Sequence, residues 1–444
     1  MDLETVYREA LAADQQLMAA RHARDAAREA EPIARAGLLP RISASAAIGC
    51  ERQDQTTAES GGANPAPARD CAEIFGAETA RTEEYGASLT QPVYDRGAWL
   101  ALDRAGDSVR RADIVLADSE QALLLRVAEA YFDVLAADEA LGFALAERDA
   151  VTEQRALAEQ RFEVGLSAIT DVQEAQARYD LTIARALEAE QALSSARDAL
   201  QEIIDQRPAA LARPGDDFAT PPPDPPALDP WTERARTENL ALRIAALDAE
   251  LARTDVASAR AQRWPSLTLE GNYGRSEQPG FVLSTETRSV GLTLDVPLFT
   301  SGRISAEVDR NAALAAQRDA QREAALRSAL RQTRSAFQAV RSSRARVAAL
   351  DKAVLSNRTA LEAAEAGVEV GTRTAVDVLD AQQALFGARS DLSRARYDYM
   401  LAVLRLERAA GTLGADDLSR LNDALVRETP LRDTATIEIA TPER

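Results

Sequence analysis

The sequence predicts a mainly α-helical protein in which two sets of very long helices are joined to two pairs of β-strands. Aromatic residues make up 5% and charged residues 28% of the 444 residues, a composition typical of long helices and coiled coils. Residues 98–164 and 303–370 contain no proline, and a heptad spacing of apolar and small residues runs within them from Leu123 to Phe162 and from Ala329 to Val368. Val164-Gly165 recurs as Val370-Gly371, 206 positions later, so two copies of one unit are expected.

The first repeat is assigned to residues 1–204. Helical spacing of apolar residues predicts a helix over residues 3–39, which ends before a proline. The period then changes to two residues, which predicts a strand with one aliphatic face and one small, polar face. Its aliphatic positions are Ile42, Ala44, Ala46 and Ile48. After a loop over residues 49–82, a second alternating segment begins at Tyr85 and completes a strand pair.

A helix over residues 98–164 follows the strand pair and would be ~100 Å long. Many positions of its heptad seam are small residues, so it is expected to pack closely against other helices. A tight tip at Val164-Gly165 and a further helix to about Ile204 complete the first repeat.

Residues 205–230 are rich in proline and are expected to form an extended linker in the middle of the molecule. The same order of elements then repeats over residues 231–411: a helix, a strand pair, a second very long helix, a tip and a final helix. Residues 412–444 are predicted to hold one short helix, from Asp416 to Leu425, and a tail without regular structure from Arg427.

Each tip is predicted from a glycine that follows a long helical run. A glycine adopts the left-handed conformation that often ends a helix, because it has no Cβ. The second tip is followed by Asp377 and Asp380, which are three residues apart and therefore share a helix face. Without further information, these acids are interpreted as two solvated carboxylates on an exposed turn.

Charge and composition argue against several classes of function. The net charge of −19 disfavours a nucleic-acid partner, because phosphate binding requires a basic surface. No apolar run reaches the ~18–20 residues of a membrane-spanning helix. The first residues lack the features of a cleavable signal, so an exported form is expected to be the mature chain with a start methionine. The two cysteines and the single histidine form no metal or nucleophile constellation, so neither enzyme activity nor a cofactor is expected.

The predicted strands require partners. A lone two-stranded hairpin is barely stable in water, and four strands per chain cannot enclose an open lumen. Strands with one aliphatic and one polar face suit a wall between lipid and water, so several copies are expected to pool their hairpins in one barrel without free edges. The alternatives are a small soluble sheet for the strands and an antiparallel coiled-coil scaffold for the helices.

The motifs at the two tips and near the end of the chain resemble the TolC family of bacterial outer-membrane exit ducts. The resemblance runs from Leu3 to about Leu425, and its most specific stretches are residues 161–172 (RFEVGLSAITDV), 370–381 (VGTRTAVDVLDA), 395–399 (ARYDY), 411–414 (GTLG) and 421–425 (LNDAL). It implies a homotrimer in the outer membrane of a Gram-negative bacterium. Three chains would form a barrel of twelve strands in the lipid and a helical tunnel in the periplasm.

The resemblance also implies a function and partners. The protein would be a passive conduit for multidrug efflux, for type I protein secretion, or for both. A periplasmic adaptor protein and an inner-membrane pump of the RND, ABC or MFS type would be its partners. The tip residues that contact the adaptor would be Val164, Gly165, Leu166, Val370, Gly371 and Thr372. The competing hypothesis is a soluble periplasmic coiled-coil adaptor or scaffold.

The same resemblance assigns roles to polar residues at the tips. In the family, acids at the places of Asp377 and Asp380 ring the closed periplasmic entrance, where crowded carboxylates repel one another and attract cations. Arg373 matches the family's gate arginine, and Thr170 and Asp171 match its partners on the neighbouring tip. Charge-assisted hydrogen bonds among them would hold adjacent hairpins closed.

Two further expectations concern Val368 and the two cysteines. A family tyrosine that bonds the tip acid is replaced here by Val368, so this gate is expected to open more readily. Cys50 and Cys71 flank the first long loop, which would face the oxidising exterior of the cell. A disulfide between them is one expectation, and two unpaired thiols are the other.

Overall fold

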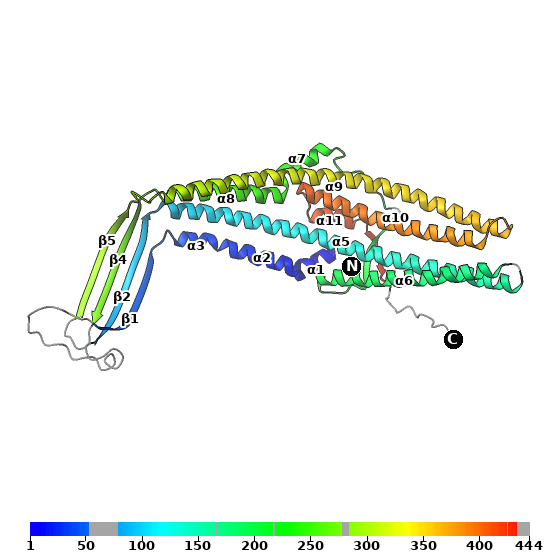
Figure 1. Ribbon diagram of the computed structural model, residues 1–444, viewed down its shortest axis with the longest axis horizontal. Helices are drawn as coiled ribbons and strands as arrows, with labels where there is room; N and C mark the ends of the chain where they lie inside the picture. Colours follow the sequence, from blue (N-terminus) through cyan, green and yellow to red (C-terminus); the bar gives the residue numbers. More distant parts are fainter. Residues whose placement is uncertain (53–78, 166, 216–217, 278–283, 424, 433–444) are drawn as a thin grey trace, which may run out of the picture. The chain divides into compact units, whose positions relative to one another are not determined.

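The computed structural model describes residues 1–52, 79–165, 167–215, 218–277, 284–423 and 425–432. These residues form two compact units. The sheet unit comprises residues 24–112 and 246–321, and the helical unit comprises residues 1–23, 113–245 and 322–444. Each unit therefore combines segments from both sequence repeats (Figure 1).

The sheet unit contains one antiparallel sheet of four strands in the order β1-β2-β4-β5 (Figure 1). Its strands are β1 (Arg41–Arg52), β2 (Thr79–Tyr94), β4 (Ser266–Glu277) and β5 (Ser284–Asp295). The two predicted strand pairs are thus present, and β2 pairs with β4 to join the repeats. All four strands are longer than the alternating segments that the sequence predicts. At the ends nearest the loops, aliphatic and polar residues no longer alternate, so the sequence pattern does not mark these residues as strand.

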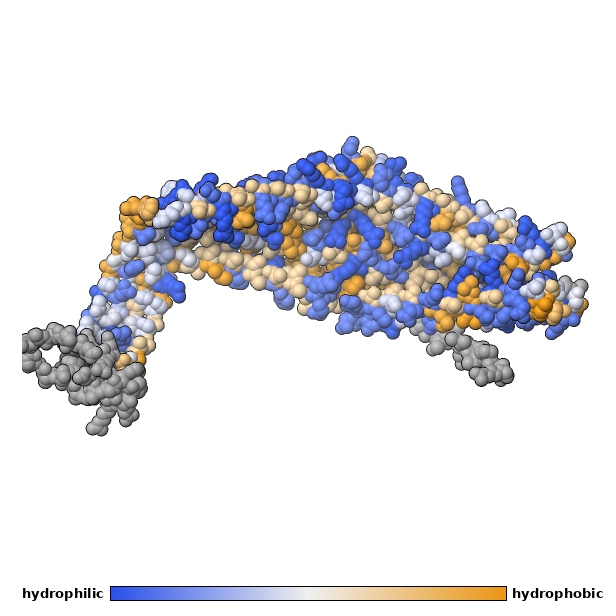
Figure 2. All heavy atoms as spheres, in the orientation of Figure 1, coloured by the Kyte–Doolittle hydropathy of each residue, from blue (hydrophilic) through white to orange (hydrophobic). Residues whose placement is uncertain are grey.

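The register confirms that the sheet has one aliphatic and one polar face. On the aliphatic face, Ile42 pairs with Leu89, and the leucines of β4 pair with those of β5. On the polar face, the hydroxyls of Ser43 and Ser88 lie 2.7 Å apart in a hydrogen bond. Aliphatic side chains gather along the strands and at their ends in the space-filling view (Figure 2), and Leu298 and Phe299 are 91% and 86% exposed.

Arginine–aspartate pairs join the helices of the sheet unit. These helices are α3 (Ala30–Ala36) and parts of α2 (Gln15–Arg28), α5 (Arg96–Glu163), α8 (Leu240–Ala261) and α9 (Arg303–Glu369). Arg104 of α5 contacts Asp255 of α8 at 2.6 Å, and Arg253 of α8 contacts Asp319 of α9 at 2.6 Å. The buried cluster beside them is small and contains Ala252, Val256 and Ala315.

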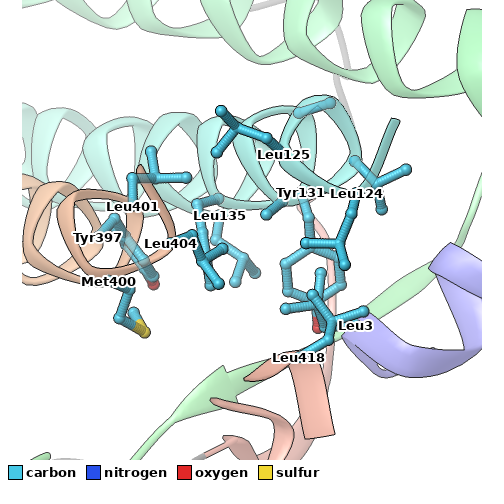
Figure 3. Close-up of a cluster of buried hydrophobic side chains, with 14 of the residues drawn as sticks. Leu3, Leu124, Leu125, Tyr131, Leu135, Tyr397, Met400, Leu401, Leu404 and Leu418 are labelled. Carbon is cyan, nitrogen blue, oxygen red and sulfur yellow. The ribbon is translucent and has the colours of Figure 1, made fainter. Parts of the chain in front are cut away.

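The helical unit holds the main core. It contains α1 (Leu3–Ala13), α6 (Ile169–Ile204), α7 (Leu228–Glu238), α10 (Ala375–Ala410), α11 (Ala415–Asn422) and the remaining parts of α2, α5, α8 and α9. Side chains of α5 and α10 meet in this core, with leucines of α1 and α11 against them (Figure 3). Tyr397 stacks on Phe132 at a centroid distance of 5.7 Å, and its hydroxyl donates to Glu139 at 2.8 Å.

Two helices that the sequence predicts as continuous are broken. The expected helix over residues 3–39 is divided into α1, α2 and α3, and its first break is at Asp14, whose carboxylate accepts from the Leu17 N–H at 2.7 Å. The helix expected from Trp231 is divided into α7 and α8 at Asn239, whose side-chain oxygen accepts from the Leu242 N–H at 3.0 Å. In both places a polar side chain caps a new helix.

The proline-rich linker and the end of the chain pair with one another. Strand β3 (Ala210–Pro214) lies antiparallel to β6 (Leu425–Pro430), where the sequence predicts an extended linker and a tail without regular structure. Beyond β6, Arg432 reaches Asp138 of α5 at 2.7 Å. Arg213 of β3 makes a second ion pair with the same carboxylate, whose side chain is fully buried. The two segments are thereby fastened to α5.

In the described parts of the chain, no helix combines the length and the apolar character needed to cross a membrane. The face of the long helices seen in Figure 2 carries many hydrophilic residues.

Candidate gate at the helical hairpin tips

The second tip, between α9 and α10, is a tight reversal of the chain. Gly371 has a φ of +74°, the left-handed conformation that the sequence predicts for it. The N–H groups of Thr372 and Arg373 then donate to the Gly367 carbonyl at 2.9 and 3.2 Å. The stem of Arg373 packs against Gly367 so closely that a Cβ there would lie 2.5 Å from the Arg373 Cγ. This glycine therefore lets the arginine lie flat against α9.

The first tip, between α5 and α6, repeats this geometry. Gly165 also has a φ of +74°, and its N–H donates to the Phe162 carbonyl at 2.9 Å. Leu166 lies outside the described residues. Val164 and Val370, which precede the two glycines, are 69% and 74% exposed. Both tips thus present an aliphatic side chain to solvent.

Asp377 holds the start of α10. Its carboxylate accepts hydrogen bonds from the backbone N–H and the hydroxyl of Thr374, both at 2.8 Å. The Asp377 N–H donates back to the Thr374 hydroxyl at 3.2 Å, which completes a capping box. Bonds from the Thr374 backbone and side chain lower the pKa of Asp377, and Arg373 adds an ion pair at 3.4 Å. The carboxylate is therefore ionised at neutral pH.

Asp380 has a different environment, although it is only one turn away. Arg178 of α6 contacts its carboxylate at 2.5 Å and donates to the side-chain oxygen of Gln383 at 2.7 Å. One guanidinium thus bonds two consecutive turns of α10 from the other hairpin of the same chain. Arg178 is not among the site residues predicted from the sequence. Its equivalent in the second repeat, 206 positions later, is Ala384, and this break in the repeat is the signal that could have found it.

A small apolar contact lies beside this polar link. Leu379 of α10 is buried with Val151 and Ala158 of α5 and Ala175 of α6. Burial of one leucine contributes about 1.5–3 kcal/mol, and an exposed ion pair contributes at most about 1 kcal/mol. The two hairpins of one chain are therefore held together weakly near their tips.

The remaining predicted gate residues lie at the start of α6. The carboxylate of Asp171 accepts from the Ala168 N–H at 3.3 Å, and Thr170 is exposed beside it. Within one chain Arg373 is paired with Asp377, so the predicted bonds from Arg373 to Thr170 and Asp171 of a neighbouring copy stay a prediction. Thr372 is exposed on the second tip.

Val368 and Cys50 take no part in these contacts. Val368 is half-buried in the last turns of α9. Cys50 belongs to β1, and Cys71 lies outside the described residues, so the pairing of the two cysteines stays a prediction. Among the described residues, no group of histidine, cysteine or acidic side chains could hold a metal ion.

Comparison with known sequences identifies the family. The profile of the outer membrane efflux protein family matches residues 6–205 and 231–412, that is, both repeats without the linker. The chain is 37% identical over 432 residues to the outer membrane protein TolC of Vibrio cholerae, and the match covers 96% of this chain and 94% of that protein. It is 30% identical to the alkaline protease secretion protein AprF of Pseudomonas aeruginosa, with coverage of 98% and 90%.

Solved structures support the same fold. The outer membrane channel CmeC of Campylobacter jejuni matches with a TM-score of 0.78 at 16% identity, covering 95% of this chain and 89% of that one. The outer membrane protein VceC of Vibrio cholerae matches with a TM-score of 0.76 at 19% identity, covering 92% and 96%. The chain therefore belongs to the outer membrane efflux protein family, and it is a TolC-like outer-membrane exit duct that extends into the periplasm.

Proposed function

We propose that three copies of the chain form a passive duct that is closed at its periplasmic end by the hairpin tips. The observation that carries this proposal is the four-stranded sheet with one aliphatic and one polar face. Its outer strands, β1 and β5, have no further partner strand among the described residues, and exposed strand edges require one. Three sheets joined edge to edge would make a barrel of twelve strands whose aliphatic face contacts lipid.

The closed mouth is proposed to lie where the second tips of three copies meet. Asp377 and Asp380 of each copy would then crowd six carboxylates around one axis, which attracts cations and repels anions. Arg373 is exposed enough to leave its partner Asp377 and to bond Asp171 and Thr170 of a neighbouring copy instead. Its side chain is 60% exposed, and its bond to Asp377 is long, at 3.4 Å. Breaking the bond between copies would let the hairpins separate.

The cargo and partners are proposed from the relatives. One relative is named for secretion of an alkaline protease, and the family is named for efflux, so we propose efflux of small toxic molecules, type I secretion of polypeptides, or both. A periplasmic adaptor protein would bind the exposed tips at Val164-Gly165-Leu166 and Val370-Gly371-Thr372. An inner-membrane pump of the RND, ABC or MFS type would supply the energy.

Planar-bilayer recording of the detergent-purified protein tests this proposal. The wild-type protein should give a small conductance that prefers cations. Replacing both mouth acids, Asp377→Asn with Asp380→Asn, should weaken the preference, whereas Glu188→Gln, an exposed acid on α6 away from the tip, should leave it unchanged. Arg373→Ser should increase the conductance. A freely water-soluble monomer without conductance would refute the duct, and unchanged selectivity in the double variant would refute the acid ring.

A further inference from the structure

Arg178 links the two helical hairpins of one chain close to their tips. It extends from α6 to Asp380 and Gln383, which lie on consecutive turns at the start of α10. The Asp380 side chain is 57% exposed and that of Arg178 is 36% exposed. The pair is therefore close to solvent and can break without leaving a buried charge.

Three other arginines near the tips interact within their own hairpin. Arg185, one arginine further along α6, bonds Glu147 of α5 at 2.9 Å, and Arg155 lies over the ring of Tyr179 at 4.5 Å. Arg373 bonds Asp377 across the second tip. Within the described residues of 147–185 and 353–390, Arg178 makes the only ion pair that crosses from the first hairpin to the second.

We propose that Arg178 is a latch whose release both opens the duct and adds negative charge to its mouth. In the latched state the guanidinium offsets the charge of Asp380 and holds α10 against α6. When the hairpins separate, the Asp380 carboxylate loses its partner and faces the passage as a free charge. This proposal rests on the proposed function, because it assigns a regulatory role to the same mouth acids.

The two acids of the mouth then have separate roles. Asp377 is bonded to Thr374 within the second tip, so these bonds persist whether the hairpins are together or apart. Asp380 is bonded across the hairpins, so its effective charge depends on their separation. The cation preference of the duct is therefore expected to be stronger in the open state than in the closed state.

Arg178→Gln removes the charge of the latch and keeps a side chain that can bond Gln383. Loss of an exposed pair changes an equilibrium about two- to fivefold, so the variant is expected to spend more time open. Its conductance in planar bilayers should rise by a similar factor, and its cation preference should increase. Arg185→Gln is the matched control: it lies on the same helix and also loses an ion pair, but one within the first hairpin, so conductance should not change.

A double-mutant comparison separates the latch from a general loosening of the fold. In an Asp380→Asn background, Arg178→Gln should add little, because the pair is already broken. The swapped pair, Arg178→Asp with Asp380→Arg, should restore the low conductance. If Arg178→Gln behaves like Arg185→Gln while the wild-type protein still conducts cations, the latch is refuted and the duct stands. If the wild-type protein forms no channel, the proposed function itself fails.

Discussion

Asp171 and Asp377 occupy the same place in the two repeats, and each accepts a hydrogen bond from the backbone N–H of the residue three positions before it. The distance is 3.3 Å from Ala168 in the first tip and 2.8 Å from Thr374 in the second. The second tip also has the Thr374 hydroxyl, which accepts from the Asp377 N–H. The first tip has alanine at that position, so only half of its capping box can form.

This asymmetry predicts the effect of Ala168→Thr. The new hydroxyl can accept from the Asp171 N–H, and a capping side chain stabilises a helix by about 0.5–2 kcal/mol. Amide hydrogen exchange at the start of α6 should slow, and exchange at the start of α10 should stay the same. Ala168→Val, which has a similar shape but no hydroxyl, is the control. Equal protection in both variants would contradict the capping argument.

Acidification should loosen the second tip. The folded tip lowers the pKa of Asp377 through bonds from the Thr374 backbone and side chain. The ionised carboxylate therefore stabilises the tip at pH values above the unfolded pKa of about 3.9, and this stabilisation is lost as the pH falls through the lower, folded pKa. Hydrogen exchange at Thr374, corrected for its intrinsic pH dependence, should accelerate in that acidic range. In Asp377→Asn this acceleration should be absent.

Asp138 should be more important for stability than either of its arginine partners. Its side chain is fully buried, whereas Arg213 and Arg432 are 15% and 42% exposed. Asp138→Ala leaves two arginines without their carboxylate, and loss of one partner of a buried ion pair costs about 3–5 kcal/mol. Arg432→Ala should cost less, because Arg213 still pairs with Asp138. Thermal unfolding in detergent, monitored by circular dichroism, should give a lower melting temperature for Asp138→Ala than for Arg432→Ala. Equal melting temperatures would contradict this prediction.

Gly411 should tolerate a Cβ much less well than Gly371. Both residues have a positive φ, which costs a residue with a Cβ about 1–2 kcal/mol. At Gly411 the Cβ would also lie 2.4 Å from the carbonyl carbon of Glu238, whereas no atom lies within 4 Å of one at Gly371. Gly411→Ala should therefore lower the melting temperature more than Gly371→Ala. The reverse order would show that the tip, not the end of α10, is the tighter turn.

Local patterns in the sequence were sufficient for the long elements. The heptad spacing and the proline positions predict α5 and α9 within a few residues of their observed ends. The alternation around Ile42 and Leu267 predicts which face of the sheet is aliphatic, because strand side chains alternate regardless of which strand is the partner. These features depend only on neighbouring residues, so they can be recognised without knowledge of the tertiary structure.

The features that the sequence analysis missed depend on distant partners. The break at Asp14 is stabilised by Arg126 of α5 at 2.8 Å, and the break at Asn239 by a bond to the Ala409 carbonyl at 3.0 Å. Strand β6 forms on β3, which lies some two hundred residues earlier in the chain. Arg178 likewise acquires its role only because α10 lies beside α6. No local pattern contains these contacts.

The small buried cluster around Leu379 has a consequence for any protein that docks at the tips. This contact between the hairpins contributes only a few kcal/mol. A ligand overcomes it when its binding free energy favours the parted form, in which the hairpins are separated, by the same amount. Thermodynamic linkage then works in both directions. A substitution that favours the parted form, such as Leu379→Ala, should tighten docking by up to the factor by which it raises the population of that form, so affinity for a partner reports on the gate even where no current is measured.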